Sequence, residues 1–167
     1  MSYLNELKAS NSIPPNALVI AAQSFFVQGV QDLIQEFGYR DESCSALKAT
    51  SWFPTDDKDV EDIKILVNIA RLLLNSRDDC NLEDIHLVDT LCEFSRVANL
   101  ELMALVLDHG VDANAVGSSG ATPFLVSCGS WSTHSSFTLA AMQLLLDRGA
   151  DVHSRVQHGK TVFFYIT

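Results

Sequence analysis

The 167-residue sequence predicts an all-α fold in which pairs of short helices stack in a row and form a solenoid. Two recurrences support this prediction. The run LLLN at Leu72–Asn75 recurs as LVLD at Leu105–Asp108, and Gly110 recurs as Gly149. In each case apolar residues at helical spacing precede a helix stop, so one helix and its turn are repeated along the chain. We therefore expect four complete helix pairs, with strands confined to short hairpin turns.

The clearest unit follows Ala98 and has the signals of a helix, a stop, a turn and the start of another helix. Leucine, methionine and valine recur at helical spacing over residues 100–107. Gly110 suits the left-handed position that follows many helix ends. Residues 111–120 are mostly small or polar and contain glycine, which is typical of a turn. Thr122 can cap the next helix, and the proline after it needs no N–H at the first helical position.

This order of signals resembles the ankyrin repeat, a helix-turn-helix unit with a hairpin whose length, about 33 residues, is also the interval between the two leucine runs. The family pattern opens on G-x-T-P-L-H-x-A-A, continues with L-E-x-V-x-x-L-L and closes on G-A-D-V-N-A. Leu125 stands where the family has its histidine, so that hydrogen-bonding element is missing. The resemblance covers the chain from Asn16 onward and is clearest from Ala98 to Thr161. The matching residues are Gly120, Thr122, Pro123, Leu100, Glu101, Leu102, Gly110, Asp112, Asn114 and Ala115.

The resemblance implies that residues 1–167 form a single ankyrin-repeat domain with four units and a partial fifth. Two units hold insertions relative to the family pattern, at residues 52–59 and at residues 129–136. The second insertion makes the interval from Gly110 to Gly149 longer than the family period. The expected units are residues 16–38, 39–76, 77–110, 111–149 and 150–167.

The remaining helices follow from apolar spacing. Residues 16–38 read as two helices, the second with an apolar face. The outer helix of the second unit is expected from Val60 to Leu74, with acidic residues at its start that suit the helix dipole. In the third unit, Leu91 and Phe94 keep the inner helix apolar, although its opening motif has decayed. The residues at the family's Gly, Thr and Pro places are Leu87, Asp89 and Thr90.

Composition excludes several classes of partner and compartment. The net charge of −10 argues against nucleic-acid phosphates and anionic membranes as partners. No run of about 20 apolar residues is present, so no membrane-spanning helix is expected. The chain opens without a basic segment before an apolar run, so we expect no signal peptide. The four cysteines form no C-x-x-C pair, which favours reduced thiols and a location in the cytoplasm or nucleus.

No residue pattern indicates catalysis, a metal or a cofactor. His153 and His158 flank a turn without a third ligand near them, and a zinc site needs three or four ligands. The acidic residues over 78–84 lack the central glycine and closing glutamate of a calcium loop. Cys128 has no nucleophile motif around it and takes the place of the family's second alanine. We therefore expect Cys128 to be a small core residue.

The resemblance implies a protein-interaction module, either an adaptor or the recognition end of a larger protein. In the ankyrin family, partners dock on hairpin tips and inner-helix faces. By position, the expected partner-binding residues are Ile85, His86, Val88, Ser118, Ser119, Ala121, Gln157, His158 and Lys160 at the tips, with Arg96 and Val97 at the end of the third unit's inner helix.

An enzyme or enzyme subunit is the alternative function. Its small-molecule pocket would lie at the insertions 52–59 and 129–136, with Trp52 and Trp131 as aromatic walls. Ligand-induced changes in tryptophan fluorescence would favour this alternative, whereas capture of one stoichiometric protein would favour the module.

Acidity is concentrated in the first two-thirds of the chain. Residues 1–60 hold 8 acidic and 4 basic residues, residues 61–110 hold 10 and 4, and residues 111–167 hold 3 and 3. This distribution favours a protein partner with a basic surface, although exposed like charges also keep a protein soluble.

The apolar run Thr161–Thr167 is the reverse of the polar cap that the end of a solenoid needs. We expect a monomer in which this tail packs against Leu139, Leu144 and Leu145 of the fourth unit. Self-pairing of two copies through the tail is the alternative.

Overall fold

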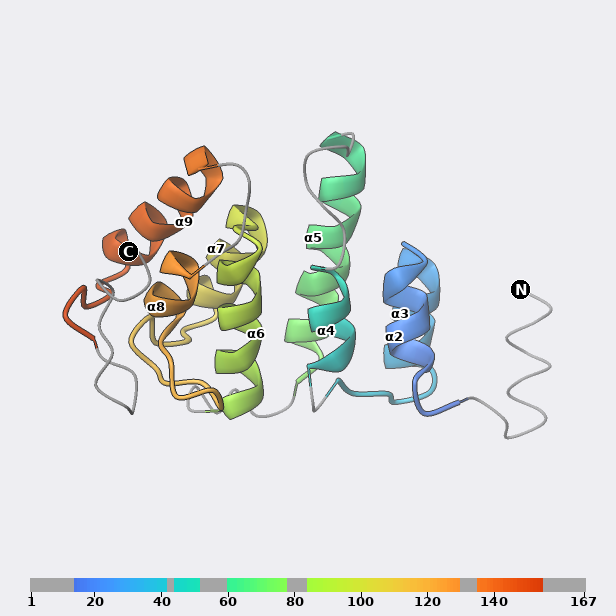
Figure 1. Cartoon of the computed structure of the whole chain (residues 1–167). Coiled ribbons are helices and arrows are strands. Elements are labelled where there is room, and N and C mark those ends of the chain that lie inside the picture. The colour runs from blue at the N-terminus through green and yellow to red at the C-terminus, as the bar shows by residue number, and fades with distance from the viewer. Residues whose placement is uncertain (1–13, 42–43, 52–59, 78–83, 130–134, 155–167) are drawn as a thin grey trace.

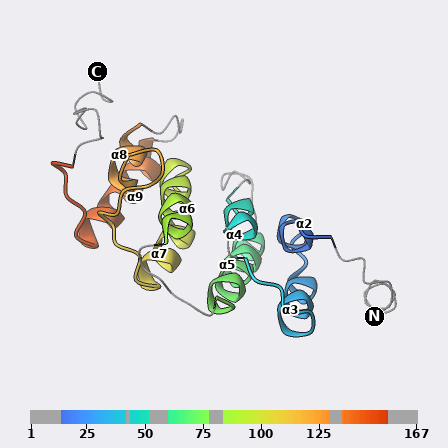
Figure 2. The same cartoon turned by 90° about the horizontal axis from the view of Figure 1, so that it is seen from below.

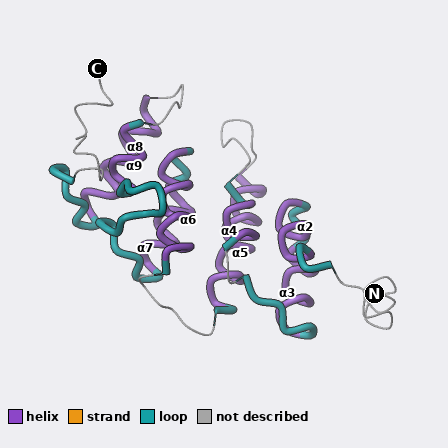
Figure 3. Tube along the Cα trace, turned by 60° about the horizontal axis from the view of Figure 1, so that its bottom comes forward, coloured by secondary structure: helices purple, strands orange, loops and turns teal. Residues whose placement is uncertain are grey.

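The structure is a computed structural model that describes residues 14–41, 44–51, 60–77, 84–129 and 135–154. Every regular element within these residues is a helix, and Figure 3 accordingly shows only helix and loop, so the all-α prediction is confirmed. The helices, labelled as in Figure 1, are α2 (Ala17–Gln23), α3 (Val27–Gln35), α4 (Ser45–Ala49), α5 (Val60–Asn75), α6 (Ile85–Arg96), α7 (Leu100–Asp108), α8 (Pro123–Cys128) and α9 (Ser135–Asp147).

These helices lie in two layers (Figure 2). We call α2, α4, α6 and α8 the inner layer, and α3, α5, α7 and α9 the outer layer. Each helix contacts the next helix of its own layer, and each inner helix contacts the outer helix that follows it in the chain. The chain therefore alternates between the layers as it advances along the row from α2 to α9 (Figure 1).

Three of the helices begin at residues whose side chains cap them. Asp84 before α6, Asn99 before α7 and Thr122 before α8 each accept a hydrogen bond from a backbone N–H of the first turn. The donor–acceptor distances are 2.8, 3.2 and 3.4 Å, respectively. Each such cap contributes about 1 kcal/mol to helix stability. Pro123 follows Thr122 at the start of α8, as the sequence predicts.

The start of α6 corrects the predicted opening of the third unit. Because α6 begins at Ile85, the residues Leu87, Asp89 and Thr90 lie inside the helix and not at a hairpin that precedes it. Aspartate caps a helix as well as threonine does, and the first helical position does not require proline. The opening of the third unit therefore lies earlier in the chain than predicted, at Asp84.

Arg77 ties the second helix pair to the third. Its guanidinium donates to the carbonyl oxygen of Asp41 at 2.6 Å and to Sγ of Cys44 at 3.0 Å, and it forms an ion pair with Asp84. The carboxylate of Asp41 accepts two N–H groups from the first turn of α4, at 3.1 and 2.7 Å. These contacts fix the start of α4 relative to the start of α6.

The turns that follow α7 and α9 are built alike. Gly110 and Gly149 adopt the left-handed conformation expected of them, with φ of 97° and 85°. Asp112 and Asp151 hold corresponding places in the two turns, and each accepts a hydrogen bond at 2.8 Å from a following backbone N–H, that of Asn114 and of His153. The chain therefore leaves α9 in the same conformation in which it leaves α7.

The core lies between the two layers and receives side chains from both. The largest side chains that are fully buried belong to Phe94, Leu47, Ile69, Leu73, Leu74, Leu91, Leu102, Met103, Leu125, Leu145, Val30 and Val106.

None of the helices in the described part of the chain has the length and apolar character needed to cross a membrane.

Candidate functional site

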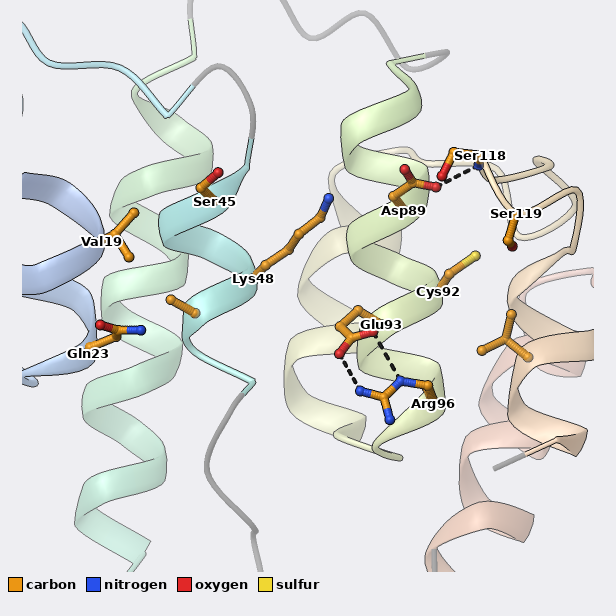
Figure 4. A pocket seen from close by; sticks show the side chains of 12 residues that line it. Val19, Gln23, Ser45, Lys48, Asp89, Cys92, Glu93, Arg96, Ser118 and Ser119 are labelled. Atoms are coloured by element: carbon orange, nitrogen blue, oxygen red, sulfur yellow. Dashed lines mark hydrogen bonds and ion pairs between the residues drawn. The ribbon is translucent and has the colours of Figure 1, made fainter. Parts of the chain in front are cut away.

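A pocket of about 840 Å³ lies on the inner layer, where α4 and α6 form its two facing walls (Figure 4). All four inner helices contribute to it, together with the loop between α7 and α8. We call it the inner-face pocket. Its lining residues are Val19, Gln23, Ser45, Lys48, Ala49, Asp89, Cys92, Glu93, Arg96, Ser118, Ser119 and Val126.

The wall formed by α6 consists of side chains that helical spacing places on one side of the helix. Asp89, Cys92, Glu93 and Arg96 follow one another at i, i+3, i+4 and i+7, which places their side chains on one side of the helix. On the opposite wall, Lys48 extends from α4 toward α6 (Figure 4). A lysine on one wall thus faces two carboxylates and an arginine on the other.

The rim of the pocket is the loop between α7 and α8, which α6 holds in place. Asp89 Oδ1 accepts a hydrogen bond from the N–H of Ser118 at 2.7 Å, and the N–H of Gly117 donates to the carbonyl of Ala121 at 3.0 Å. A Cβ atom at Gly117 would lie only 2.8 Å from Asp89 Oδ1, so glycine permits the close approach. Ser118 and Ser119 remain exposed at the rim.

The charged groups of the pocket differ in their partners. Arg96 Nε donates to Glu93 Oε2 at 3.1 Å, and this hydrogen bond raises the pKa of the Arg96 guanidinium. Asp89 is engaged by the rim loop. The ammonium group of Lys48 has no hydrogen-bond or ion-pair partner among the described residues. Lys48 is therefore the charge of the pocket that can respond to an incoming group without breaking an internal contact.

The thiol of Cys92 lines the pocket and is buried. Its pKa is raised to about 12, mainly by burial and further by the carboxylates of Asp89 and Glu93, whereas Lys48 lowers it. A thiol with this pKa is protonated at neutral pH and is a poor nucleophile. Burial also raises the pKa of Cys128, which packs partly buried against the core. Cys92 is therefore poorly suited to act as a nucleophile.

The structure brings some of the predicted partner-binding residues to this pocket. Arg96, Ser118 and Ser119 line it. Val97 is the C-cap of α6, half-buried beside the pocket, and Ala121 is buried beneath the rim, where its carbonyl accepts the hydrogen bond from Gly117. The remaining tip residues of the last unit, Gln157, His158 and Lys160, lie outside the described residues.

The predicted tip of the third unit requires a correction. Ile85, His86 and Val88 are in the first turn of α6 and not in a hairpin, because the helix is capped at Asp84. Ile85 and His86 are exposed there, whereas Val88 is buried and cannot contact a partner. Neither Ile85 nor His86 lines the inner-face pocket.

The sequence prediction missed the charged pocket residues Lys48, Asp89 and Glu93, and the thiol of Cys92. Correct placement of the α6 cap would have revealed Asp89, Cys92 and Glu93, since they share the helix face of Arg96. Lys48 had no comparable signal, because its position depends on how α4 stacks beside α6.

A second pocket of about 510 Å³ lies on the outer layer. It lies on the opposite layer from the residues predicted to bind a partner, and so provides matched control positions. Its lining residues are Ile63, Lys64, Val67, Asn68, Arg71 and Glu101.

The pocket expected for the alternative enzyme function falls mostly outside the described residues. Trp52 and Trp131, the aromatic walls expected for this pocket, lie in residues 52–59 and 130–134, which are outside the described residues. Within the described ranges, no group of three or more histidine, cysteine, aspartate and glutamate side chains is arranged to hold a metal ion.

Comparison with protein-family models gives no match to this chain, and comparison with curated proteins gives none either.

Proposed function

We propose that this chain is an ankyrin-type repeat domain that binds a protein partner in the inner-face pocket. The two-layer row of helix pairs supports the proposal, as do the recurring leucine runs of the outer helices and the left-handed glycines Gly110 and Gly149. Ankyrin repeats bind partners on inner-helix faces and loop tips, and the pocket is lined by both. On the cysteine usage noted above, we expect the module to work in the cytoplasm or nucleus.

The observation that supports this function best is the convergence of Arg96, Ser118 and Ser119 on one pocket. Their positions in the repeat alone predict that they contact a partner. A partner segment lying across the pocket would contact side chains of all four inner helices at once. Such a segment would also reach the half-buried apolar side chains of Val19 and Val126.

The charges of the pocket bear on the charge expected of the partner. Lys48 and Arg96 balance Asp89 and Glu93, so the pocket itself does not require a basic partner. The acidity that favours a basic partner runs from Asp56 to Asp84, and residues 56–59 and 78–83 of this stretch are outside the described residues. Asp84 is already engaged as the cap of α6 and the ion-pair partner of Arg77. A basic partner surface therefore remains a prediction from overall charge, separate from the pocket.

Site-specific photo-crosslinking tests this function. A photoreactive residue replaces Ser119 at the pocket rim, and in the control it replaces Asn68, which is exposed on the outer layer. In a lysate of the source cells, the Ser119 variant is expected to crosslink one protein in stoichiometric yield, and the Asn68 variant is not. Equal crosslinking from both positions, or crosslinking from Asn68 alone, would contradict the assignment of the pocket.

A further inference from the structure

Lys48 is the charged side chain of the inner-face pocket to which the described residues supply no partner. It is half-buried and extends from α4 across the pocket toward α6 (Figure 4). Neither a hydrogen bond nor an ion pair joins its ammonium group to any described residue. Because a half-buried ammonium group has lost part of its hydration, an opposite charge brought beside it gains more than it would at a fully exposed lysine.

The two carboxylates that face Lys48 already have contacts of their own. Glu93 pairs with the guanidinium of Arg96 through both of its oxygens, one of which accepts from Nε at 3.1 Å. Asp89 Oδ1 accepts the N–H of Ser118 at 2.7 Å and so holds the rim loop. Neither carboxylate forms an ion pair with Lys48. The positive charge of Lys48 is therefore available to a group that enters the pocket from outside.

Apolar side chains lie at both ends of the pocket. Val19 belongs to α2 and Val126 to α8, the first and last helices of the inner layer, and both are half-buried. Lys48 lies between them in the row, because α4 contacts α2 on one side and α6 on the other. A segment that crosses the inner layer from α2 to α8 therefore meets an apolar surface, then a positive charge, then a second apolar surface.

We propose that the partner segment in the inner-face pocket carries an aspartate or glutamate that pairs with Lys48, between apolar residues that contact Val19 and Val126. This inference rests on the proposed function, since it names the chemistry of the segment bound at that site. The carboxylate supplies Lys48 with the anion that the chain does not provide. The flanking apolar residues remove the two valines from water, which stabilises the complex in proportion to the apolar area buried.

The charges of the pocket favour a single negative charge over the alternatives. A basic side chain in the same place would face Lys48 with a like charge. A phosphorylated side chain carries a charge of about −1.5 to −2 at pH 7, which is more than Lys48 can compensate beside Asp89 and Glu93. One carboxylate brings a charge that Lys48 matches. The pocket therefore fits an ordinary acidic residue.

Selection from a library of random peptides displayed on phage tests the proposal, with the full chain as bait. The baits are the parent, Lys48→Glu and the control Arg71→Glu, which makes the same charge change on the outer layer. The parent and Arg71→Glu should enrich peptides that share an acidic residue between apolar residues. Lys48→Glu should lose these peptides and enrich others that have a lysine or arginine at that place.

Synthetic copies of the enriched peptide show whether its acidic residue pairs with Lys48. A copy with lysine in place of the acidic residue should bind the parent at least about tenfold more weakly than the original peptide. The same copy should bind Lys48→Glu at least about tenfold more tightly than the original does. Recovery by exchange of the two charges requires that they interact, because independent effects of the two substitutions would simply add. A copy with phosphoserine should bind the parent more weakly than the original.

A milder variant covers the case in which Lys48→Glu does not fold. Lys48→Met keeps an apolar stem of similar length and removes only the charge. It should bind the acidic peptide and its asparagine or glutamine copy equally well, whereas the parent should prefer the acidic peptide. An equal preference in Lys48→Met and in the parent would overturn the proposal.

Other outcomes that overturn the proposal are distinct from failure of the proposed function. An enriched set without a shared acidic residue overturns it, as does the absence of any enriched set. A loss of binding in Lys48→Glu that the charge exchange does not recover also overturns it, and so does tighter binding of the phosphoserine copy. Crosslinking from Ser119 tests the proposed function without reference to the charge of the partner. A partner crosslinked there, together with any of these outcomes, would leave protein binding standing and remove only the acidic residue.

Discussion

Asp84 and Arg77 form an ion pair in which the aspartate has a second role as the cap of α6. One carboxylate oxygen pairs with the guanidinium, and the other accepts the N–H of His86 at 2.8 Å. Both side chains are largely buried. Arg77 also holds Asp41 and Cys44 beside α4, so one carboxylate influences both walls of the inner-face pocket.

Replacing Asp84 by Ala should therefore destabilise the protein strongly. The substitution removes a cap and takes the carboxylate of Asp84 from a mostly buried guanidinium, and breaking a buried ion pair costs about 3–5 kcal/mol. Asp108→Ala is the matched control, because it breaks the ion pair with Arg148 on the surface, which is worth less than about 1 kcal/mol. Urea denaturation measures both. Similar losses of unfolding free energy in the two variants would mean that Asp84 does not stabilise the contact between the second and third helix pairs.

Gly149→Val and Gly110→Val should each destabilise the protein, whereas Gly129→Ala should not. Gly149 and Gly110 have positive φ, which a β-branched residue adopts at a cost of about 1–3 kcal/mol. A Cβ at Gly149 would meet no atom within 4 Å, so the loss there reports backbone strain alone. Gly129 has φ of −87° and makes no such demand. Thermal unfolding gives the comparison, and equal losses at all three positions would contradict the repeat register.

Two buried thiols should make the protein less stable above pH 9. The pKa of Cys44 is raised from 9.0 to about 11 and that of Cys92 to about 12, mainly by burial. Between pH 9 and 11 the unfolded chain loses these protons while the folded chain keeps them, so stability is full below pH 9 and falls as pH rises. The slope is about 1.4 kcal/mol per pH unit for each thiol.

The double variant Cys44→Ala and Cys92→Ala provides the control for this prediction. Urea denaturation at pH 8 and pH 10.5 should show a loss in the parent that is much smaller in the variant. An identical pH dependence in the two proteins would show that the buried thiols are not its source.

The helices could be predicted from the sequence because the signals that start and end them are local. Gly149 after a run of leucines, and Thr122 before proline, each act within one turn of chain. The start of α6 was misplaced because Asp84 caps the helix without the Thr-Pro element that the register required. Hydrogen-bonding capacity alone, without the family motif, identifies Asp84 as the cap and so predicts the correct start of α6.

The pocket could be predicted only in part, since its walls meet across different helix pairs. Ser118 and Ser119 followed from their position in a turn, and Arg96 from its place at a helix end. The approach of Lys48 to α6 depends on the stacking of α4, and the burial of Val88 depends on the register of α6. Arg77 gave no sequence signal, because its partners Asp41 and Cys44 come from a segment far from it in the chain.

The most direct test of the binding function is the affinity of the crosslinked partner for Lys48→Glu and for Arg71→Glu, measured by titration calorimetry. Both variants replace a positive charge by a negative one. Lys48 is half-buried in the inner-face pocket, and Arg71 is exposed on the outer layer. Lys48→Glu should weaken binding at least about tenfold, or 1.4 kcal/mol, while Arg71→Glu changes it less than about twofold. Unchanged affinity in Lys48→Glu, or an equal loss in both variants, would contradict the inner-face pocket as the binding site.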